Sequence, residues 1–169
     1  AVTLTDGIIE RTTSVTRTRT IPAQTIAANG YAVIDLGSGF LPNGGAIVTL
    51  RDAAGRVVDT VTYPALERGQ VAARTASGDW VTDYPSSPGQ PNQPAPTATV
   101  TATGTSTPSS TPTPTATPLP PVVAIHLSEI QANPHRGEPE WIELHNPNPT
   151  AVTLTDGIIE RTTSVTRTR

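Results

Sequence analysis

AVTLTDGIIERTTSVTRTR, residues 1–19, decides how this chain folds, because residues 151–169 repeat it without a single change. The two copies lie 150 residues apart. An identical repeat at a long fixed period is typical of arrayed or self-complementing proteins. We therefore expect the chain to begin and end inside the same kind of domain, one period apart, and we expect its function to depend on how copies join.

The composition limits the classes of protein to which the chain can belong. The 169 residues include no Cys and no Met, and all 11 basic residues are Arg. Without Cys the chain has neither a disulfide framework nor a thiolate metal site. The missing Met predicts a processed product or an excerpt, and the lack of oxidisable sulfur favours a protein that works outside the cell.

Charge and hydropathy exclude two further classes. The net charge is −3 and charged residues make up 15% of the chain. Such a chain has no basic footprint for nucleic acid or for an anionic membrane surface. No apolar run approaches the ~18 residues that span a bilayer. We expect a soluble protein whose secretion signal or anchor, if it has one, lies outside this sequence.

Alternating apolar residues predict many short strands, separated by Gly, Pro and Asn turns such as Asp6-Gly7 and Asn29-Gly30. Ile21-Pro22 should end the second strand, and Val48 and Leu50 should pack with alternate residues of the strand after them. Residues 65–76 are expected to form a loop or an irregular edge. The predicted strands are residues 2–5, 8–20, 31–36, 46–50, 56–63, 122–128 and 140–145.

Residues 93–121 differ in composition from the rest of the chain. Thr and Pro dominate these 29 residues, and large apolar side chains are nearly absent. Such a segment does not bury enough surface to offset its chain entropy, so we expect an extended, solvated linker. At ~3.1 Å per residue it could reach on the order of 90 Å, and its hydroxyls could carry O-linked sugars.

Placed in the order 122–150 and then 1–92, the remaining sequence resembles the lamin tail domain family. The resemblance rests on EWIELHNP at residues 140–147, on the SPGQPN ending at 87–92, and on the motif residues Glu129, Asn133, Glu140, Trp141, Glu143, Asn146, Gly55, Asp59, Tyr63 and Trp80. It implies an immunoglobulin-like β-sandwich from a secreted or surface-attached protein. The family usually has Gly-Trp where this chain has Gly7-Ile8, so Ile8 or Ile9 should replace the tryptophan anchor. Many short strands punctuated by Gly and Pro also favour a sandwich.

The candidate chemistry is sparse. Glu129, Glu138, Glu140 and Glu143 form the acidic cluster, for which a solvated or capping role is favoured over calcium binding. Glu140 and Glu143 are three apart on a strand and should face opposite sides. His126, His135 and His145 have no close ligand spacing, so a structural or surface role is favoured over a metal site.

The aromatic residues and the arginines have two interpretations each. Trp80, Trp141, Tyr31 and Tyr63 are better explained by core packing than by a ligand platform. The Arg and Thr alternation of residues 11–19 is better explained by a guarded strand edge than by binding of an anionic glycan. Neither a nucleophile elbow nor a phosphate-binding glycine loop is present, and no cofactor is expected.

These features predict a non-enzymatic structural protein. Residues 1–92 should form the body of a sandwich that lacks its first strands, and residues 122–169 should supply those strands to the same body, to a neighbouring chain or to the next repeat. We expect an extracellular or cell-surface fibre whose partner is a further copy of the chain, with a surface adhesin or an accessory binding module as the alternative. The residues expected to join copies are Val123, Ile125, Leu127, Ile130, Trp141, Ile142 and Leu144.

Overall fold

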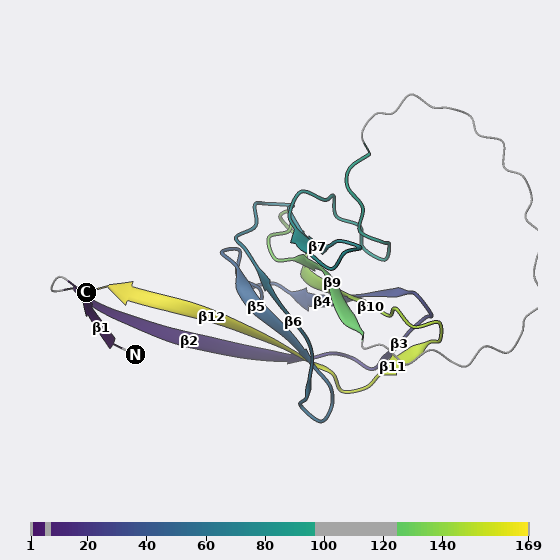
Figure 1. Ribbon diagram of the computed structural model, residues 1–169, viewed down its shortest axis with the longest axis horizontal. Coiled ribbons are helices and arrows are strands. Elements are labelled where there is room, and N and C mark those ends of the chain that lie inside the picture. The colour runs from purple at the N-terminus through teal and green to yellow at the C-terminus, as the bar shows by residue number, and fades with distance from the viewer. Residues whose placement is uncertain (1, 6–7, 97–124, 169) are drawn as a thin grey trace, which may run out of the picture.

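The computed structural model describes residues 2–5, 8–96 and 125–168, and within them the side chains of 14–96 and 125–164. This part of the chain is all β, and it contains no helix (Figure 1). The strands are β1 (Val2–Thr5), β2 (Ile8–Thr20), β3 (Gln24–Ile26), β4 (Tyr31–Gly37), β5 (Ala46–Arg51), β6 (Val57–Tyr63), β7 (Ala72–Arg74), β8 (Trp80–Val81), β9 (His126–Gln131), β10 (Glu140–His145), β11 (Val152–Leu154) and β12 (Ile158–Thr168).

The strands form two five-stranded antiparallel sheets and one short pair, an arrangement consistent with a β-sandwich. The first sheet has the order β1-β2-β12-β5-β6, and the second has the order β4-β10-β9-β7-β8. The short pair joins β11 to β3. Both large sheets contain strands from the two ends of the sequence, so residues that precede and follow 97–124 build one body (Figure 1).

One hydrophobic core unites the two sheets. Tyr63, Leu36, Leu50, Leu127 and Leu144 are among its largest side chains, and each is at most 1% exposed. Val48 lies opposite Val61 and Ala46 lies opposite Tyr63, so β5 and β6 pack in the alternation that the sequence predicted. Burial of each aliphatic side chain stabilises the fold by roughly 1.5–3 kcal/mol.

Most predicted strands are found, with small changes at their ends. β2 ends at Thr20, immediately before Ile21-Pro22, and β4, β5, β6 and β10 lie where the alternation predicted them. The strand predicted at 122–128 is observed from His126 to Gln131, while residues 122–124 and the Asp6-Gly7 turn lie outside the described residues.

Three short strands were not predicted. β7 lies inside the segment expected to be a loop or an irregular edge, yet it pairs with β9 and with β8 and is an interior strand of its sheet. β3 pairs with β11 over three residues. Strands this short carry too few alternating side chains to show a period, and tertiary pairing decides their conformation.

β2 and β12 form a long two-stranded ribbon that leaves the body of the sandwich (Figure 1). Residues Ile158–Thr162 of β12 also pair with β5, so this end of the ribbon is part of the first sheet. β1 pairs with β2 at the far end of the ribbon. The ribbon joins the two copies of the duplicated stretch to each other.

Candidate assembly site

The strands that follow residues 97–124 lie in the middle of the second sheet. β10 pairs with β4 on one side and with β9 on the other, and β9 pairs with β7. β4 and β7 both come earlier in the chain. Without β9 and β10, the facing edges of β4 and β7 would have unpaired backbone groups, which are costly when they are shielded from water.

Most residues predicted for the joining element lie in the core. Trp141 is half-buried, and Val123 lies outside the described residues. Ile142 and Leu144 share one face of β10, as predicted, and each is 0% exposed. The buried members of the set are Ile125, Leu127, Ile130, Ile142 and Leu144.

Glu140 holds a loop of the body to the start of β10. Its carboxylate accepts hydrogen bonds from the backbone N–H groups of Gly39 at 2.6 Å, Phe40 at 2.9 Å and Leu41 at 2.6 Å. Glu140 is 6% exposed. Three donors compensate the desolvation of this carboxylate, so Glu140 has the capping role that the sequence favoured and not the solvated one.

Glu129 and Glu143 are cross-strand partners on β9 and β10, and both are fully buried. Their solvated interpretation is therefore wrong. Ser87 donates its N–H to Glu129 at 3.2 Å and its hydroxyl at 3.1 Å, and the N–H of Gly89 donates to Glu143 Oε2. The two carboxylates thus fasten the segment after β8 across β9 and β10.

Burial raises the pKa of both carboxyl groups. For Glu129 the N–H and hydroxyl of Ser87 oppose the rise. For Glu143 burial and the charge of Glu129 outweigh the N–H of Gly89, and the pKa reaches about 7. Glu143 Oε1 is buried and has no hydrogen-bond partner. An unsatisfied buried oxygen favours the protonated carboxyl, so Glu143 is sensitive to pH near neutrality.

Two asparagines of the motif donate hydrogen bonds to backbone carbonyls of the neighbouring loops. Asn146 Nδ2 donates to the carbonyls of Ile26 at 3.1 Å, Ala27 at 2.8 Å and Thr150 at 2.9 Å. Asn133 Nδ2 donates to the carbonyl of Leu66 at 2.9 Å. Asn133 follows β9 and Asn146 follows β10, so both tie the loops after these strands to the body.

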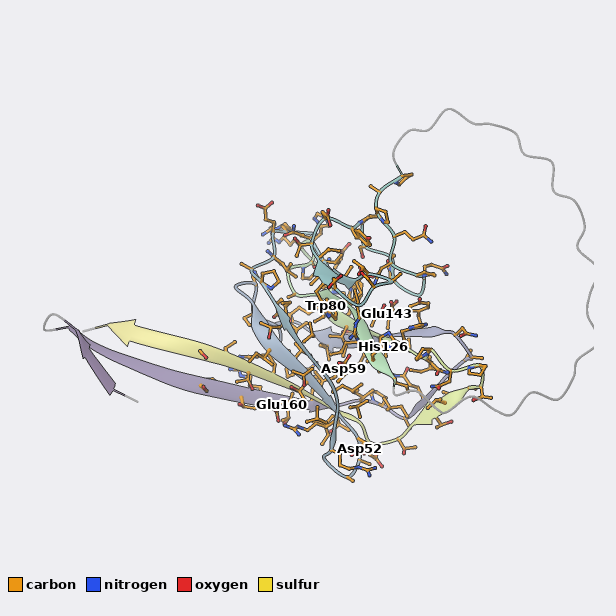
Figure 2. The ribbon with its side chains drawn as sticks, in the orientation of Figure 1. Asp52, Asp59, Trp80, His126, Glu143 and Glu160 are labelled. Atoms are coloured by element: carbon orange, nitrogen blue, oxygen red, sulfur yellow. The ribbon has the colours of Figure 1, made fainter. Side chains whose placement is uncertain are left out.

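Asp59 connects the two sheets. Its Oδ2 accepts the N–H of Leu127 on β9 at 2.9 Å and a hydrogen bond from Arg74 Nη1 on β7 at 3.0 Å. The carboxylate stands on β6 of the first sheet. One half-buried acceptor, labelled in Figure 2, therefore anchors the start of β9 to the opposite sheet.

The remaining motif residues have structural positions. Gly55 has a φ of 78° in the hairpin loop between β5 and β6, a conformation that disfavours other residues. Tyr63 is 1% exposed and donates its hydroxyl to the carbonyl of Pro42 at 2.9 Å. Trp80 is half-buried against the core. The core role predicted for these two aromatic residues agrees with their positions.

The second copy of the duplicated stretch occupies the strand position beside β5. Ile159, the counterpart of Ile9, is 0% exposed and belongs to the hydrophobic core. Arg161 is 7% exposed and donates from Nε to the carbonyl of Phe40 at 2.9 Å. Glu160 pairs with Arg51 at 3.3 Å. The same sequence in the first copy forms a hairpin with β1 instead.

The arginines of β2 lie on a strand with one free side. β1 pairs with β2 only as far as Arg11, and from there to Thr20 the described partner of β2 is β12. Arg19 donates to the carbonyl of Leu36 and lies over the Phe40 ring at 5.3 Å. Charged side chains on such a strand would oppose further pairing, and the edge interpretation stays a prediction.

His126 and His145 form a pair that sequence spacing did not show. They are cross-strand partners, with His145 Nδ1 3.1 Å from His126 Nε2, and Tyr31 stacks on His145 with ring centroids 4.4 Å apart. Burial lowers both pKa values, that of His126 to about 4. Tyr31 is thus a wall of this site and not a core residue. The signal lay in the register of β9 and β10, which a bulge at Glu143/Leu144 shifts.

This chain matches no known family model, no curated protein and no solved structure. Among the described residues, no group of three or more His, Cys, Asp or Glu side chains is placed to hold a metal ion. The same part of the chain contains no helix of the length and apolarity that crossing a membrane requires.

Proposed function

We propose that this chain is a structural, non-enzymatic subunit of an extracellular or cell-surface fibre. Repeating sandwich domains of the immunoglobulin-like, lamin tail type would be joined head to tail. The link would be the donation of the four strands β9, β10, β11 and β12 to the next body, the Thr/Pro-rich linker, or both. The partner is a further copy of the same chain, and O-linked sugars on the linker are compatible with this role. Neither nucleic acid nor a membrane is needed as a partner.

The central position of β9 and β10 carries the proposal. A body made of the strands before residue 97 has a vacant place between β4 and β7, and the strands that fill it arrive from the other side of the linker. Donor strands on a tether fill such a place from the same chain or from a neighbour, since the contacts are identical. Head-to-tail donation that does not close on itself propagates from chain to chain and gives a fibre.

The length of the linker also supports the proposal. The chain leaves the body near Asn92, whose Nδ2 donates to the carbonyl of Ser128 at 2.9 Å. The points that residues 93–125 connect are therefore neighbours in the fold. A link of about eight residues would suffice, because an extended chain covers ~3.3 Å per residue. The extra length is useful when the strands must reach another body.

A deletion that keeps every described strand tests this proposal. Removal of residues 97–121 leaves a link long enough to complete the chain's own body, yet too short to reach a second body easily. We expect sedimentation to show oligomers that grow with concentration for the full chain, and a folded monomer for the deletion variant. Negative-stain images should show beads at regular spacing for the full chain alone. A full chain that stays monomeric, or a deletion variant that assembles equally, contradicts the proposal.

A pocket favours the second candidate, a binding module of an adhesin or of a larger secreted protein. It has a volume of about 280 Å³, and Tyr31, Arg74, Asn92, His126 and His145 are among its lining residues. Aromatic and polar groups of this kind suit a small polar ligand. Shifts of the two imidazole NMR signals on titration with sugars would support this function, and unchanged signals would contradict it.

A further inference from the structure

The register between β2 and β12 has an internal symmetry. Ser164 pairs with Ser14, its own counterpart in the first copy, and the pairing extends evenly in both directions. Ile158 therefore lies opposite Thr20, and Thr162 lies opposite Thr16. A hairpin closed within a single copy has this same register, with Ile8 opposite Thr20, Thr12 opposite Thr16, and residues 13–15 as a three-residue loop.

The backbone pairing of β12 with β5 ends where that loop would begin. β5 pairs with Ile158–Thr162 and with no later residue of the described part of β12. Residues 163–168 pair with β2 alone, along the part of the ribbon that leaves the body. In the first sheet, residues 158–162 of the second copy thus lie next to β5, and residues 16–20 of the first copy lie on their other side.

The strand that would complete such a hairpin within the first copy has the same sequence as the strand that pairs with β5. Residues 8–12 of the first copy have the same side chains as residues 158–162. Ile9 and Arg11 would therefore make the contacts that Ile159 and Arg161 make in the core and with the Phe40 carbonyl. Identical groups give identical contact energies, so only chain connectivity separates the two occupants.

We propose that the strand position beside β5 is a binding site for either copy, and that residues 13–15 are the hinge at which the first copy folds back to occupy it. This inference does not depend on fibre formation, because both occupants belong to one chain. Entry of the first copy releases residues 151–169. The released segment then fits the same position in a second copy of the chain, so the hinge controls the availability of a donor strand.

The composition of the hinge explains why the extended ribbon is the observed state. Three-residue hairpin loops usually place one residue in the left-handed region, where Gly is favoured. Thr13, Ser14 and Val15 include two β-branched residues and no Gly. Extension instead adds the pairs from Thr163 to Thr168. Closing the hairpin is therefore opposed locally, although it is compatible with every contact in the body.

Disulfide trapping distinguishes the two occupants, and the Cys-free chain suits it. Thr162 lies opposite Ile47 on β5, so Thr162→Cys with Ile47→Cys traps the observed state. Thr12 lies opposite Thr166, about 13 Å further along the ribbon at ~3.3 Å per residue. Thr12→Cys with Ile47→Cys is then too distant for a disulfide unless the first copy occupies the site.

Oxidation is carried out on dilute protein, and disulfide-linked monomers are separated from dimers on non-reducing gels. We expect both cysteine pairs to form disulfides within monomers. Ser14→Asn with Val15→Gly should raise the yield of the Thr12–Ile47 pair about fivefold, because it relieves ~1 kcal/mol of left-handed backbone cost. The matched change Ser164→Asn with Val165→Gly weakens the same ribbon without improving the hinge, and should have a smaller effect.

Three results would overturn the inference. The first is a disulfide in the variant with Thr162→Cys and Ile47→Cys but none in the variant with Thr12→Cys and Ile47→Cys, with or without the hinge substitutions. The second is a Thr12–Ile47 disulfide found only in dimers, which would restrict the first copy to other chains. The third is an equal response to the two pairs of hinge substitutions. Disulfides within monomers form whether or not the chain assembles into fibres, so failure of the proposed fibre would not alter these outcomes.

Discussion

Glu143 and His126 should give the fold two opposing dependences on pH (Figure 2). Burial, helped by the charge of Glu129 opposite, raises the pKa of Glu143 from 4.5 to about 7. The folded state then binds more protons than the unfolded chain between these values. The contribution of Glu143 is fully present below pH 4.5 and is lost as the pH rises through 7. One pKa unit is about 1.4 kcal/mol, so the loss is about 3 kcal/mol.

His126 acts in the opposite direction. Burial, with the charge of Arg74 and the neighbouring His145 against that of Asp59, lowers its pKa from 6.5 to about 4. The folded state binds fewer protons than the unfolded chain in this window, so stability falls by about 3 kcal/mol as the pH falls from 6.5 to 4. The two contributions nearly cancel between pH 4.5 and 6.5, and the unmodified chain should conceal both.

Single substitutions separate the two groups. Urea unfolding of Glu143→Gln and His126→Asn is compared with the unmodified chain from pH 4 to pH 8. Relative to that chain, Glu143→Gln should gain about 3 kcal/mol between pH 4.5 and pH 7.5, and His126→Asn should gain about as much as the pH falls from 6.5 to 4. Glu67→Gln, at an exposed carboxylate, is the control and should follow the unmodified chain. A Glu143→Gln difference that is constant with pH would refute the reasoning.

Three further substitutions test individual contacts. Glu140→Gln leaves three backbone donors with a weaker acceptor and should cost about 2 kcal/mol in urea unfolding, with faster amide exchange at Phe40 and Leu41; unchanged exchange would contradict the capping role. Asn146→Ala removes the hydrogen bonds that Nδ2 donates to the carbonyls of Ile26, Ala27 and Thr150, together with those that Oδ1 accepts from Asn148, and should cost ~3 kcal/mol. A cost under ~1 kcal/mol would show that water replaces them. Ile159→Ala should cost less than the ~2–5 kcal/mol of an ordinary buried substitution, because the unaltered first copy takes the place of the altered second copy beside β5. Ile9→Ala combined with Ile159→Ala alters both copies and should show the full cost. If the costs of Ile9→Ala and Ile159→Ala, measured singly, add up to the cost of the double variant, exchange of the copies is contradicted.

Alternation along the sequence was sufficient to predict the principal strands. β4, β5, β6 and β10 each place buried apolar residues at alternate positions, and such a pattern is local. It also predicted that Ile142 and Leu144 share a face. β7 and β8 escaped prediction because strands of three and two residues have no measurable period, and only their pairing with β9 and with each other defines them.

The burial of the glutamates was not accessible to the same reasoning. Nothing near Glu129, Glu140 or Glu143 in the sequence identifies their donors, which come from residues 39–41 and 87–89, on the other side of the linker. The duplicated stretch shows the limit most directly. One sequence forms a hairpin in its first copy, yet separates into β11 and β12 in its second, because the partners differ.

The central claim is that β9 to β12 complete a sandwich from their own chain or from a neighbour. Mixing two chains, one with Ile47→Cys and one with Thr162→Cys, tests it most directly, since these positions are partners across β5 and β12. We predict a disulfide-linked heterodimer whose yield rises with concentration, and a loss of that product when residues 97–121 are deleted from both chains. Absence of the heterodimer at every concentration, while both cysteines in one chain form a disulfide readily, would contradict donation between chains.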